Sequence, residues 1–357
     1  NALLELFGVI MLYKGGMQIY KILFIYGLRF GIMGAFTPLF LKVSSKVGMA
    51  TCYLLANILR IIGSYMLLFN DTNNLLIFIF VISISGSLSN PIADAMSNKY
   101  VESRHRGKFN SVITISKILG QTFASIVLTI GIVTLNNILL LIVVAVFFLI
   151  CYFFVLKIDY KPKVQDKSIF KKTLQFILKE NSDFKTIYSL KTNHIIERYF
   201  IPLYLYIVLQ DFVSFSTVIT VSLALQLISV LVIGKLTDKN LKKTSTFVTI
   251  LKSIITSIYL FLKNPLIISL NKMVSDNFDK AYEASIQSSI QNLMKKSNEN
   301  KEVLAAVGQM SLCFTEVIVF LVLSFVSIYI NEYVFYIIFG LSIISTISIN
   351  KIIVKND

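Results

Sequence analysis

The residues whose spacing is most regular for chemistry lie in one stretch of the C-terminal half. Five charged side chains lie there at positions i, i+4, i+7, i+8 and i+11: Lys272, Asp276, Asp279, Lys280 and Glu283. This spacing puts all five on one face of an α-helix, where neighbours four residues apart can form ion pairs. A purely structural lock would need fewer charges. The additional carboxylates are therefore available for proton transfer or for a cationic solute.

A second charged segment covers residues 186–209. Lys191, His194 and Arg198 share one helical face there, and Glu197 lies beside His194. Histidine titrates near neutral pH, which suits a proton relay, although a neighbouring His–Glu pair is also common in a structural role. A guanidinium pairs well with carboxylate or phosphate, so Arg198 suits an anionic group on a solute.

A third polar face runs along residues 74–98 and includes Asn90 and Asp94. Pro91 predicts a kink beside Asp94 that frees a backbone carbonyl. Two interpretations stay open. Asp94 either lines a cavity, or it pairs with Lys99 or Arg106 and closes one end of that cavity.

Arg29 is an isolated charge in an apolar stretch that also carries small residues. It lies among Gly27, Gly31 and Gly34, and glycines let membrane helices approach closely. We expect an inter-helix partner for Arg29, with a role in the cavity as the alternative. The same two interpretations apply to three further isolated charges: Arg60, Lys117 and Glu316.

The composition places these segments in a membrane. The mean hydropathy is +0.75, and 55% of the residues are hydrophobic against 15% charged, which is outside the range of soluble domains. Because an ionisable side chain inside a membrane helix costs about 2.5–3.5 kcal/mol, the polar faces are expected to turn toward a shared cavity. The net charge of +15 sits in loops, and the three cysteines lie in apolar stretches. We therefore predict no nucleic-acid partner, no metal site and no cofactor.

Apolar runs of the roughly 20 residues that cross a bilayer, together with an internal repeat described below, predict an all-α protein with twelve spans. We place them at 1–13, 18–41, 47–69, 74–98, 108–133, 136–156, 186–209, 213–234, 244–262, 265–294, 302–329 and 332–354. The charged segment 265–294 is not apolar enough to be found by hydropathy, and it is included because the repeat aligns it with the apolar span at 74–98. The first span is incomplete, so we expect further residues before Asn1.

The basic residues predict an orientation in the membrane. The loops at 42–46, 99–108, 157–185, 235–243 and 295–301, together with the C-terminus, hold 23 of the 34 Lys and Arg, against three on the opposite side. Because positively charged loops stay cytoplasmic, we expect both termini to lie in the cytoplasm. The linker 157–185 has the pattern of an amphipathic helix on the inner leaflet.

The two halves of the chain resemble each other at an offset of 193 residues. Residues 234–243 read GKLTDKNLKK, a degenerate copy LKVSSKVG occupies 41–48, and 7–13 aligns with 200–206 at the same offset. Halves of this length indicate a parallel duplication and not a solenoid. The sequence at 234–243 resembles the Gly-x-Leu-x-Asp-Arg-x-Gly-Arg loop of the major facilitator superfamily.

This resemblance implies two six-helix bundles, at 1–156 and 186–357, joined by the linker 157–185. The acid of the family's loop stabilises one conformational state; Asp238 matches it, whereas Ser45 stands there in the first half. We expect the conformational gate to include Gly234, Asp238, Lys239, Lys46, Gly48, Arg106 and Gly107. In the family, the first, fourth, seventh and tenth helices line the substrate cavity.

The function that the resemblance implies is secondary transport of a small organic solute by alternating access, coupled to protons. The protein would be a monomer in a bacterial cytoplasmic membrane, with the solute, protons and the lipid bilayer as its partners. The cavity for substrate and protons would be lined by Arg29, Asn90, Asp94, His194, Glu197, Arg198, Lys272, Asp276, Asp279, Lys280 and Glu283. A sensor or scaffold that keeps the fold without transport is the alternative. An integral membrane enzyme has less support.

Overall fold

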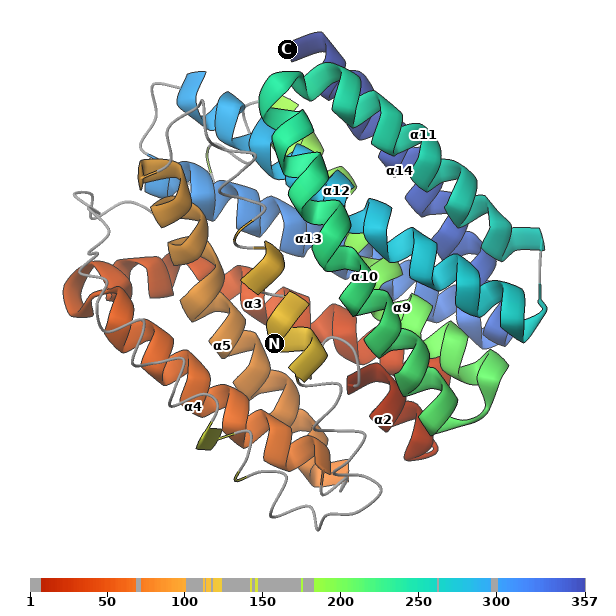
Figure 1. Ribbon diagram of the computed structural model, residues 1–357. Coiled ribbons are helices and arrows are strands. Elements are labelled where there is room, and N and C mark those ends of the chain that lie inside the picture. The colour runs from red at the N-terminus through yellow and green to blue at the C-terminus, as the bar shows by residue number, and fades with distance from the viewer. Residues whose placement is uncertain are drawn as a thin grey trace.

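The computed structural model describes residues 8–68, 72–100, 183–261, 263–296 and 301–356, with isolated positions between 112 and 175. These residues form ten α-helices and no strand: α2 (Gly8–Lys14), α3 (Ile19–Val47), α4 (Met49–Leu68), α5 (Thr72–Tyr100), α9 (Asp183–Leu209), α10 (Phe212–Lys239), α11 (Leu241–Phe261), α12 (Pro265–Lys296), α13 (Lys301–Ile330) and α14 (Val334–Asn356). A short 3-10 helix, η2 (Asn331–Tyr333), joins the last two. The all-α prediction is confirmed, as Figure 1 shows.

The predicted count of twelve spans is not confirmed. The expected spans at 108–133 and 136–156 lie largely outside the described residues, as do most of the linker 157–185 and the start of the first span. The least apolar expected span, 265–294, is one continuous helix, α12, from Pro265 to Lys296. Among the described residues, four stretches are long and apolar enough to cross a membrane: Ile19–Val47, Met49–Met66, Leu241–Phe261 and Val303–Asn356.

Two predicted loops are in fact the ends of helices. We expected turns at 42–46 and 235–243, but α3 continues to Val47 and α10 to Lys239. Gly48 makes the first break with a φ of 87°, a value that few residues except glycine adopt. Asn240 makes the second break, because its side chain accepts the backbone N–H of Lys243 at 2.9 Å and so caps α11. The breaks are therefore single residues.

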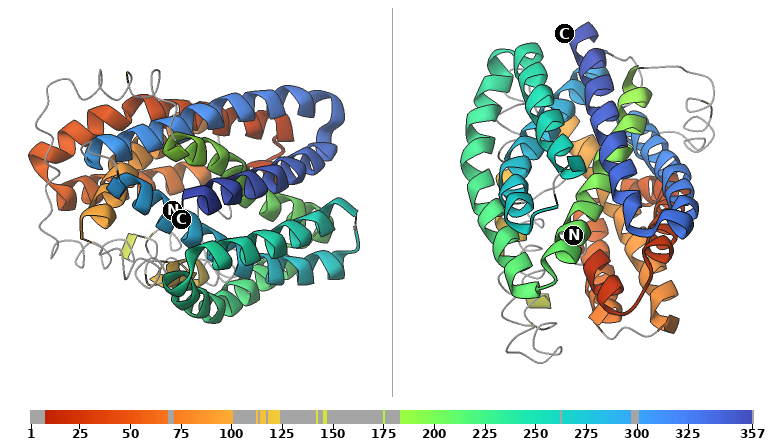
Figure 2. Two further views of the ribbon diagram at one scale, coloured as in Figure 1. Left: turned by 90° about the horizontal axis from the view of Figure 1, so that it is seen from above. Right: turned by 90° about the vertical axis from the view of Figure 1, so that its right-hand side faces the viewer.

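The most extensive contact between two helices joins the N-terminal and the C-terminal half of the chain. α3 packs against α13, and the views in Figure 2 show the two running side by side. Glycines on α3 face α13: a Cβ placed at Gly27 would lie 3.1 Å from the Phe320 Cβ, and one at Gly34 would lie 2.8 Å from the Cys313 Cβ. Small residues at such positions let helix backbones approach in a membrane protein.

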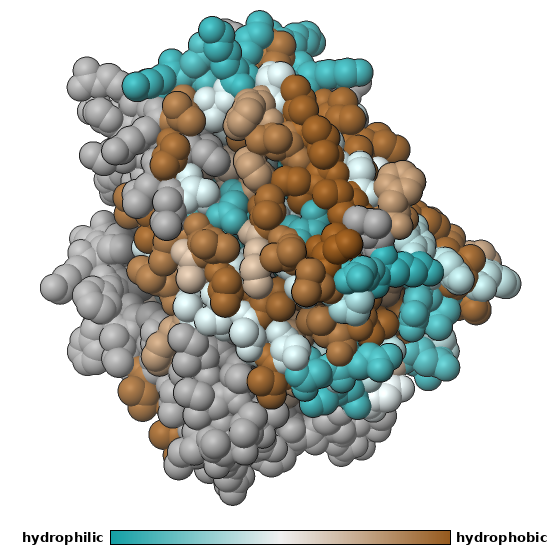
Figure 3. Space-filling view, turned by 45° about the vertical axis from the view of Figure 1, so that its right-hand side comes forward, coloured by the Kyte–Doolittle hydropathy of each residue, from teal (hydrophilic) through white to brown (hydrophobic). Residues whose placement is uncertain are grey.

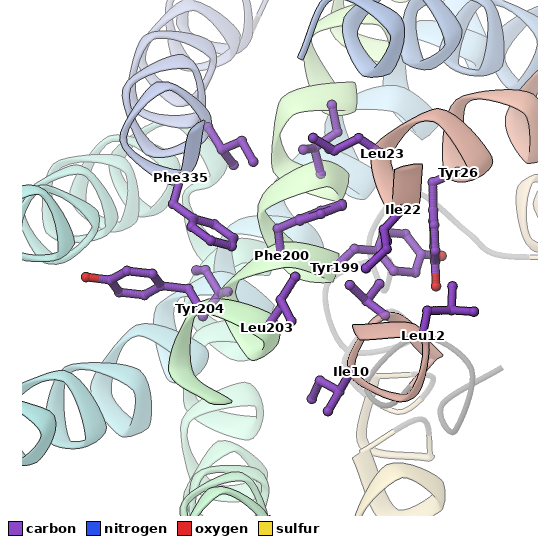
Figure 4. Close-up of a cluster of buried hydrophobic side chains, with 14 of the residues drawn as sticks. Ile10, Leu12, Ile22, Leu23, Tyr26, Tyr199, Phe200, Leu203, Tyr204 and Phe335 are labelled. Atoms are coloured by element: carbon purple, nitrogen blue, oxygen red, sulfur yellow. The ribbon is translucent and has the colours of Figure 1, made fainter. Parts of the chain in front are cut away.

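Aromatic residues fill the core between α2, α3, α9, α13 and α14. Figure 4 shows Tyr26, Tyr199 and Phe200 meeting there, and the rings of Tyr26 and Tyr199 lie 5.2 Å apart. On the face drawn in Figure 3, hydrophobic residues cover much of the middle and most hydrophilic residues lie toward the ends. That distribution is typical of a protein with lipid around its middle.

Candidate functional site

A buried lysine organises the charged site. Lys252 lies near the middle of α11, and its side chain is 1% exposed. Its Nζ donates to Asp279 Oδ1 at 2.5 Å, lies 2.7 Å from His194 Nδ1 and is 3.1 Å from Glu197 Oε2. One ammonium thus joins α9, α11 and α12. A buried charge is tolerated only with such partners.

The carboxylate of Glu197 is satisfied by several donors. Ser342 on α14 donates its hydroxyl to Oε2, and Thr256 on α11 donates to Oε1 at 3.2 Å. Together with Lys252 these contacts occupy both oxygens. Glu197 therefore anchors a network of four helices.

His194 completes this network in its neutral form. An ammonium only donates hydrogen bonds, so His194 Nδ1 must accept from Lys252 and the ring proton must be on Nε2. The Nε2 atom is buried and has no hydrogen-bond partner in the described part of the chain. The edge of the ring packs on Tyr282, with centroids 5.7 Å apart. His194 is thus placed to accept a proton only if Lys252 moves away.

Asp279 connects the buried network to a more accessible face. Its side chain is 17% exposed, whereas those of Lys252 and Glu197 are each 1% exposed. Beside it, Arg198 Nη2 donates to Glu283 Oε2 at 2.6 Å, and these side chains are 25% and 15% exposed. Lys280 also reaches Glu283, at 3.4 Å. A positive and a negative group are therefore both accessible from one side of α9 and α12.

A separate ion pair lies one turn earlier on α12. Lys272 donates to Asp276, and Ser222 on α10 donates to the other oxygen of Asp276 at 2.5 Å. The spacing argument left the pairing of Asp276 open between Lys272 and Lys280. The structure pairs it with Lys272, whereas Lys280 contacts Glu283.

The structure thus brings eight of the predicted site residues, all on α9 and α12, into three groups, each held together by its own ion pairs. It does not bring Arg29 or Asn90 to them. Asn90 on α5 contacts Ser89 and the sulfur of Met33. Asp94 lies on α5, which continues through Pro91 to Tyr100, but its side chain is outside the described residues.

Arg29 lies in an aromatic enclosure on α3. Its guanidinium carbon is 5.4 Å, 5.1 Å and 5.5 Å from the ring centroids of Tyr26, Phe30 and Tyr199. Its Nη1 also donates to the Tyr199 hydroxyl at 3.4 Å. These cation–π contacts stabilise a buried guanidinium, and they provide the inter-helix partner that the sequence led us to expect.

The predicted gate residues are only partly described. Lys46 and Lys239 lie in the last turns of α3 and α10, and Gly48 is the break after α3. Gly234 and Asp238 lie on α10, but their surroundings are outside the described residues, as are Arg106 and Gly107 altogether.

Sequence reasoning missed Lys252, the central residue. One signal could have found it: polar residues of α11 recur at helical spacing and are all buried, namely Ser245, Thr249, Lys252 and Thr256. A buried polar stripe on a helix indicates polar partners on its neighbours.

One group of side chains offers ligand atoms of the kind that bind metals. Atoms of His194, Glu197 and Asp279 all lie within 4.8 Å of one another. The Lys252 ammonium already contacts each of these three residues. A metal ion there would have to displace it.

The comparisons with known proteins agree with this architecture. The family model of the Major Facilitator Superfamily matches residues 14–275. A bacterial homologue of the iron transporter ferroportin, in its outward-facing state, superposes with a TM-score of 0.60 at 13% identity, covering 100% of this chain and 99% of that one. A point mutant of the nucleoside transporter NupG superposes with a TM-score of 0.64 at 15% identity, covering 98% and 96%. No curated protein matches the chain.

The family model covers more than half of the chain. The two solved structures share the fold of this chain over nearly the whole length of the chain. The chain belongs to the Major Facilitator Superfamily and is an integral membrane transporter.

Proposed function

We propose that this transporter moves a small organic solute by alternating access and couples that movement to protons. The observation that carries the proposal is the buried Lys252 network, in which Asp279 is partly exposed whereas Lys252 and Glu197 are buried. Buried ionisable residues in membrane helices are costly and mark solute or proton pathways. The two bundles at 1–156 and 186–357 would rock around this site, with both termini in the cytoplasm.

The proposed proton step uses groups that already touch. A proton that reaches Asp279 from the accessible side would weaken its ion pair with Lys252, because a neutral acid attracts an ammonium less than a carboxylate does. Lys252 would then depend on Glu197 alone for a charged partner, and His194 could take a different hydrogen bond. Protonation of one accessible acid thus rearranges contacts on four helices.

The partly exposed charged side chains also indicate which charge a bound solute would carry. Arg198 and Glu283 pair with each other at 2.6 Å while both remain partly exposed. A solute with an anionic group would compete for Arg198, and one with a cationic group would compete for Asp279 or Glu283. A small solute that carries either charge fits this face.

A ligand screen by thermal unfolding tests the proposal. The purified protein would be heated with a panel of metabolites and drugs at about pH 5.5 and about pH 7.5, on either side of the ordinary histidine pKa. A ligand stabilises the state that it binds. We expect at least one compound whose stabilisation depends on pH and is lost in Asp279→Asn. Asp211→Asn, which removes an exposed acid that is not part of the network, should keep it.

Two results would contradict the proposal. Stabilisation that is equal at both pH values and unchanged in Asp279→Asn would place the binding site and the coupling elsewhere. A panel that yields no ligand would favour the sensor or scaffold instead.

A further inference from the structure

Glu316 is a buried acid that the charged network on α9, α11 and α12 does not use. It lies in the middle of α13, and its side chain is fully buried. Neither carboxylate oxygen has a hydrogen-bond partner in the described part of the chain. Every other buried acid discussed above has at least one donor. This contrast sets Glu316 apart.

α3 and α13 are closely packed on both sides of Glu316 along the helix. A Cβ placed on Gly31 would lie 3.3 Å from a Val317 methyl carbon. A Cβ placed on Gly34 would lie 2.8 Å from the Cys313 Cβ. Backbone and side chains are therefore in contact one residue after Glu316 and one turn before it. Water has no room to solvate the carboxyl while the two helices are packed in this way.

The charged and titratable groups around Glu316 come from three helices. Arg29 on α3 and Lys191 on α9 are the cations whose charge acts on it, and Cys313 lies one turn away on its own helix. In this state Arg29 Nη1 donates to Tyr199, and its guanidinium carbon lies 5.1–5.5 Å from three ring centroids. α5 also packs against α13 and carries Asp94, whose side chain is outside the described residues.

A carboxylate without donors in this place is strongly disfavoured, whereas the neutral acid loses much less on burial. The packed arrangement of α3 and α13 therefore accommodates the protonated acid. If the helices separated, water would enter, the O–H bond would break and the proton would pass to that water. The carboxylate that remains can pair with Arg29.

We propose that Glu316 is a second proton-binding site of this transporter, which binds its proton when α3 and α13 are packed and releases it when they separate. The proposal rests on the proposed proton coupling but not on any solute. It places one proton at the contact between the two halves of the chain, apart from the Lys252 network.

Infrared and distance measurements on the protein in lipid nanodiscs test this directly without a solute. The infrared signal is the carbonyl stretch of a protonated carboxylic acid, followed during a pH titration. The distance is measured between spin labels attached through Gln18→Cys and Asn264→Cys, two exposed positions on the two halves. We expect the acid band to disappear and the label distance to grow over the same pH range.

Glu316→Gln is the decisive variant, because glutamine has the size of the neutral acid and cannot ionise. We expect it to lack the acid band and to keep the short label distance at every pH. Asp211→Asn, which changes an exposed acid that belongs to neither site, should keep both responses. Arg29→Gln, which removes the partner of the ionised form, should keep the acid band to higher pH than the wild type.

The proposal is overturned if the acid band persists in Glu316→Gln, or if that variant opens with pH as the wild type does. Because no solute is used, these results are independent of the ligand screen. If the thermal screen finds no ligand but Glu316 responds to pH as expected, the proposed solute binding is rejected and the proton site at Glu316 stands. If the screen finds a ligand but Glu316 does not respond, only the proton site is rejected.

Discussion

Replacing Lys252 by methionine tests whether its ammonium balances the buried charges. Methionine is about as long and is apolar, so the substitution removes the charge with little change in volume. Glu197, whose side chain is 1% exposed, would then keep only hydroxyl donors and a neutral imidazole. Removing one partner of a buried ion pair costs about 3–5 kcal/mol. Asp279 adds less to this cost, because it is 17% exposed and can be hydrated.

A double-mutant cycle separates lost packing from the unpaired charge. In Lys252→Met with Glu197→Gln, both charges are gone, and replacing a buried ion pair by neutral groups is often close to neutral. We therefore expect the double variant to be more stable than Lys252→Met alone, with a coupling energy between the two positions of about 2 kcal/mol or more, as is typical of residues in contact.

The assay is unfolding by a denaturing detergent in mixed micelles, measured as a free energy. Lys243→Met is the matched control, because Lys243 is an exposed residue of the same helix, and its change should stay within about 0.5 kcal/mol. The reasoning is refuted if Lys252→Met loses less than about 1 kcal/mol, or if the effects of the two substitutions simply add.

Three further predictions concern the helix contacts and ends. Gly34→Ala should destabilise the α3–α13 contact by about 1–3 kcal/mol in the same unfolding assay, because its Cβ would lie 2.8 Å from the Cys313 Cβ; Gly340→Ala, where a new Cβ meets nothing within 4 Å, should not. Arg29→Met should reduce stability through the loss of three cation–π contacts, and Arg29→Lys should restore part of it. Asp211 is the cap of α10, and Ser214 donates to its carboxylate through its hydroxyl and its backbone N–H, which holds the pKa of this exposed carboxyl below its usual value. Asp211→Ala should therefore be less stable than the wild type above the ordinary aspartate pKa of about 3.9. This difference in stability should vanish as the pH falls through the lowered pKa of Asp211.

The fold could be predicted largely from apolar length and the internal repeat. α12 is the clearest case, because five charges on one face lower its hydropathy, yet the repeat places a span at 265–294 and the helix covers Pro265–Lys296. The ends of α3 and α10 could not be predicted, because a basic stretch after an apolar run has the same composition whether it is a loop or a last helical turn. Only the conformation of Gly48 and the capping by Asn240 decide where those helices break.

The candidate site was predicted on two helices and missed on the third. Helical spacing says which residues of α9 and α12 share a face, so His194, Glu197 and Asp279 could be named from the sequence. It does not say which neighbouring helix faces them, so the contact with Lys252 on α11 could not be foreseen. For the same reason the isolated Glu316 and Arg29 could be noticed, but not their common position at the α3–α13 contact.

Proton movement driven by a solute gradient tests the central claim most directly. The protein would be reconstituted in vesicles that contain a pH-sensitive dye, and a solute identified by the thermal screen would be added outside. We predict that the solute changes the internal pH in wild-type vesicles and in Asp211→Asn vesicles, but not in Asp279→Asn vesicles. Solute uptake without any pH change in the wild type, or an unchanged proton movement in Asp279→Asn, would contradict the account.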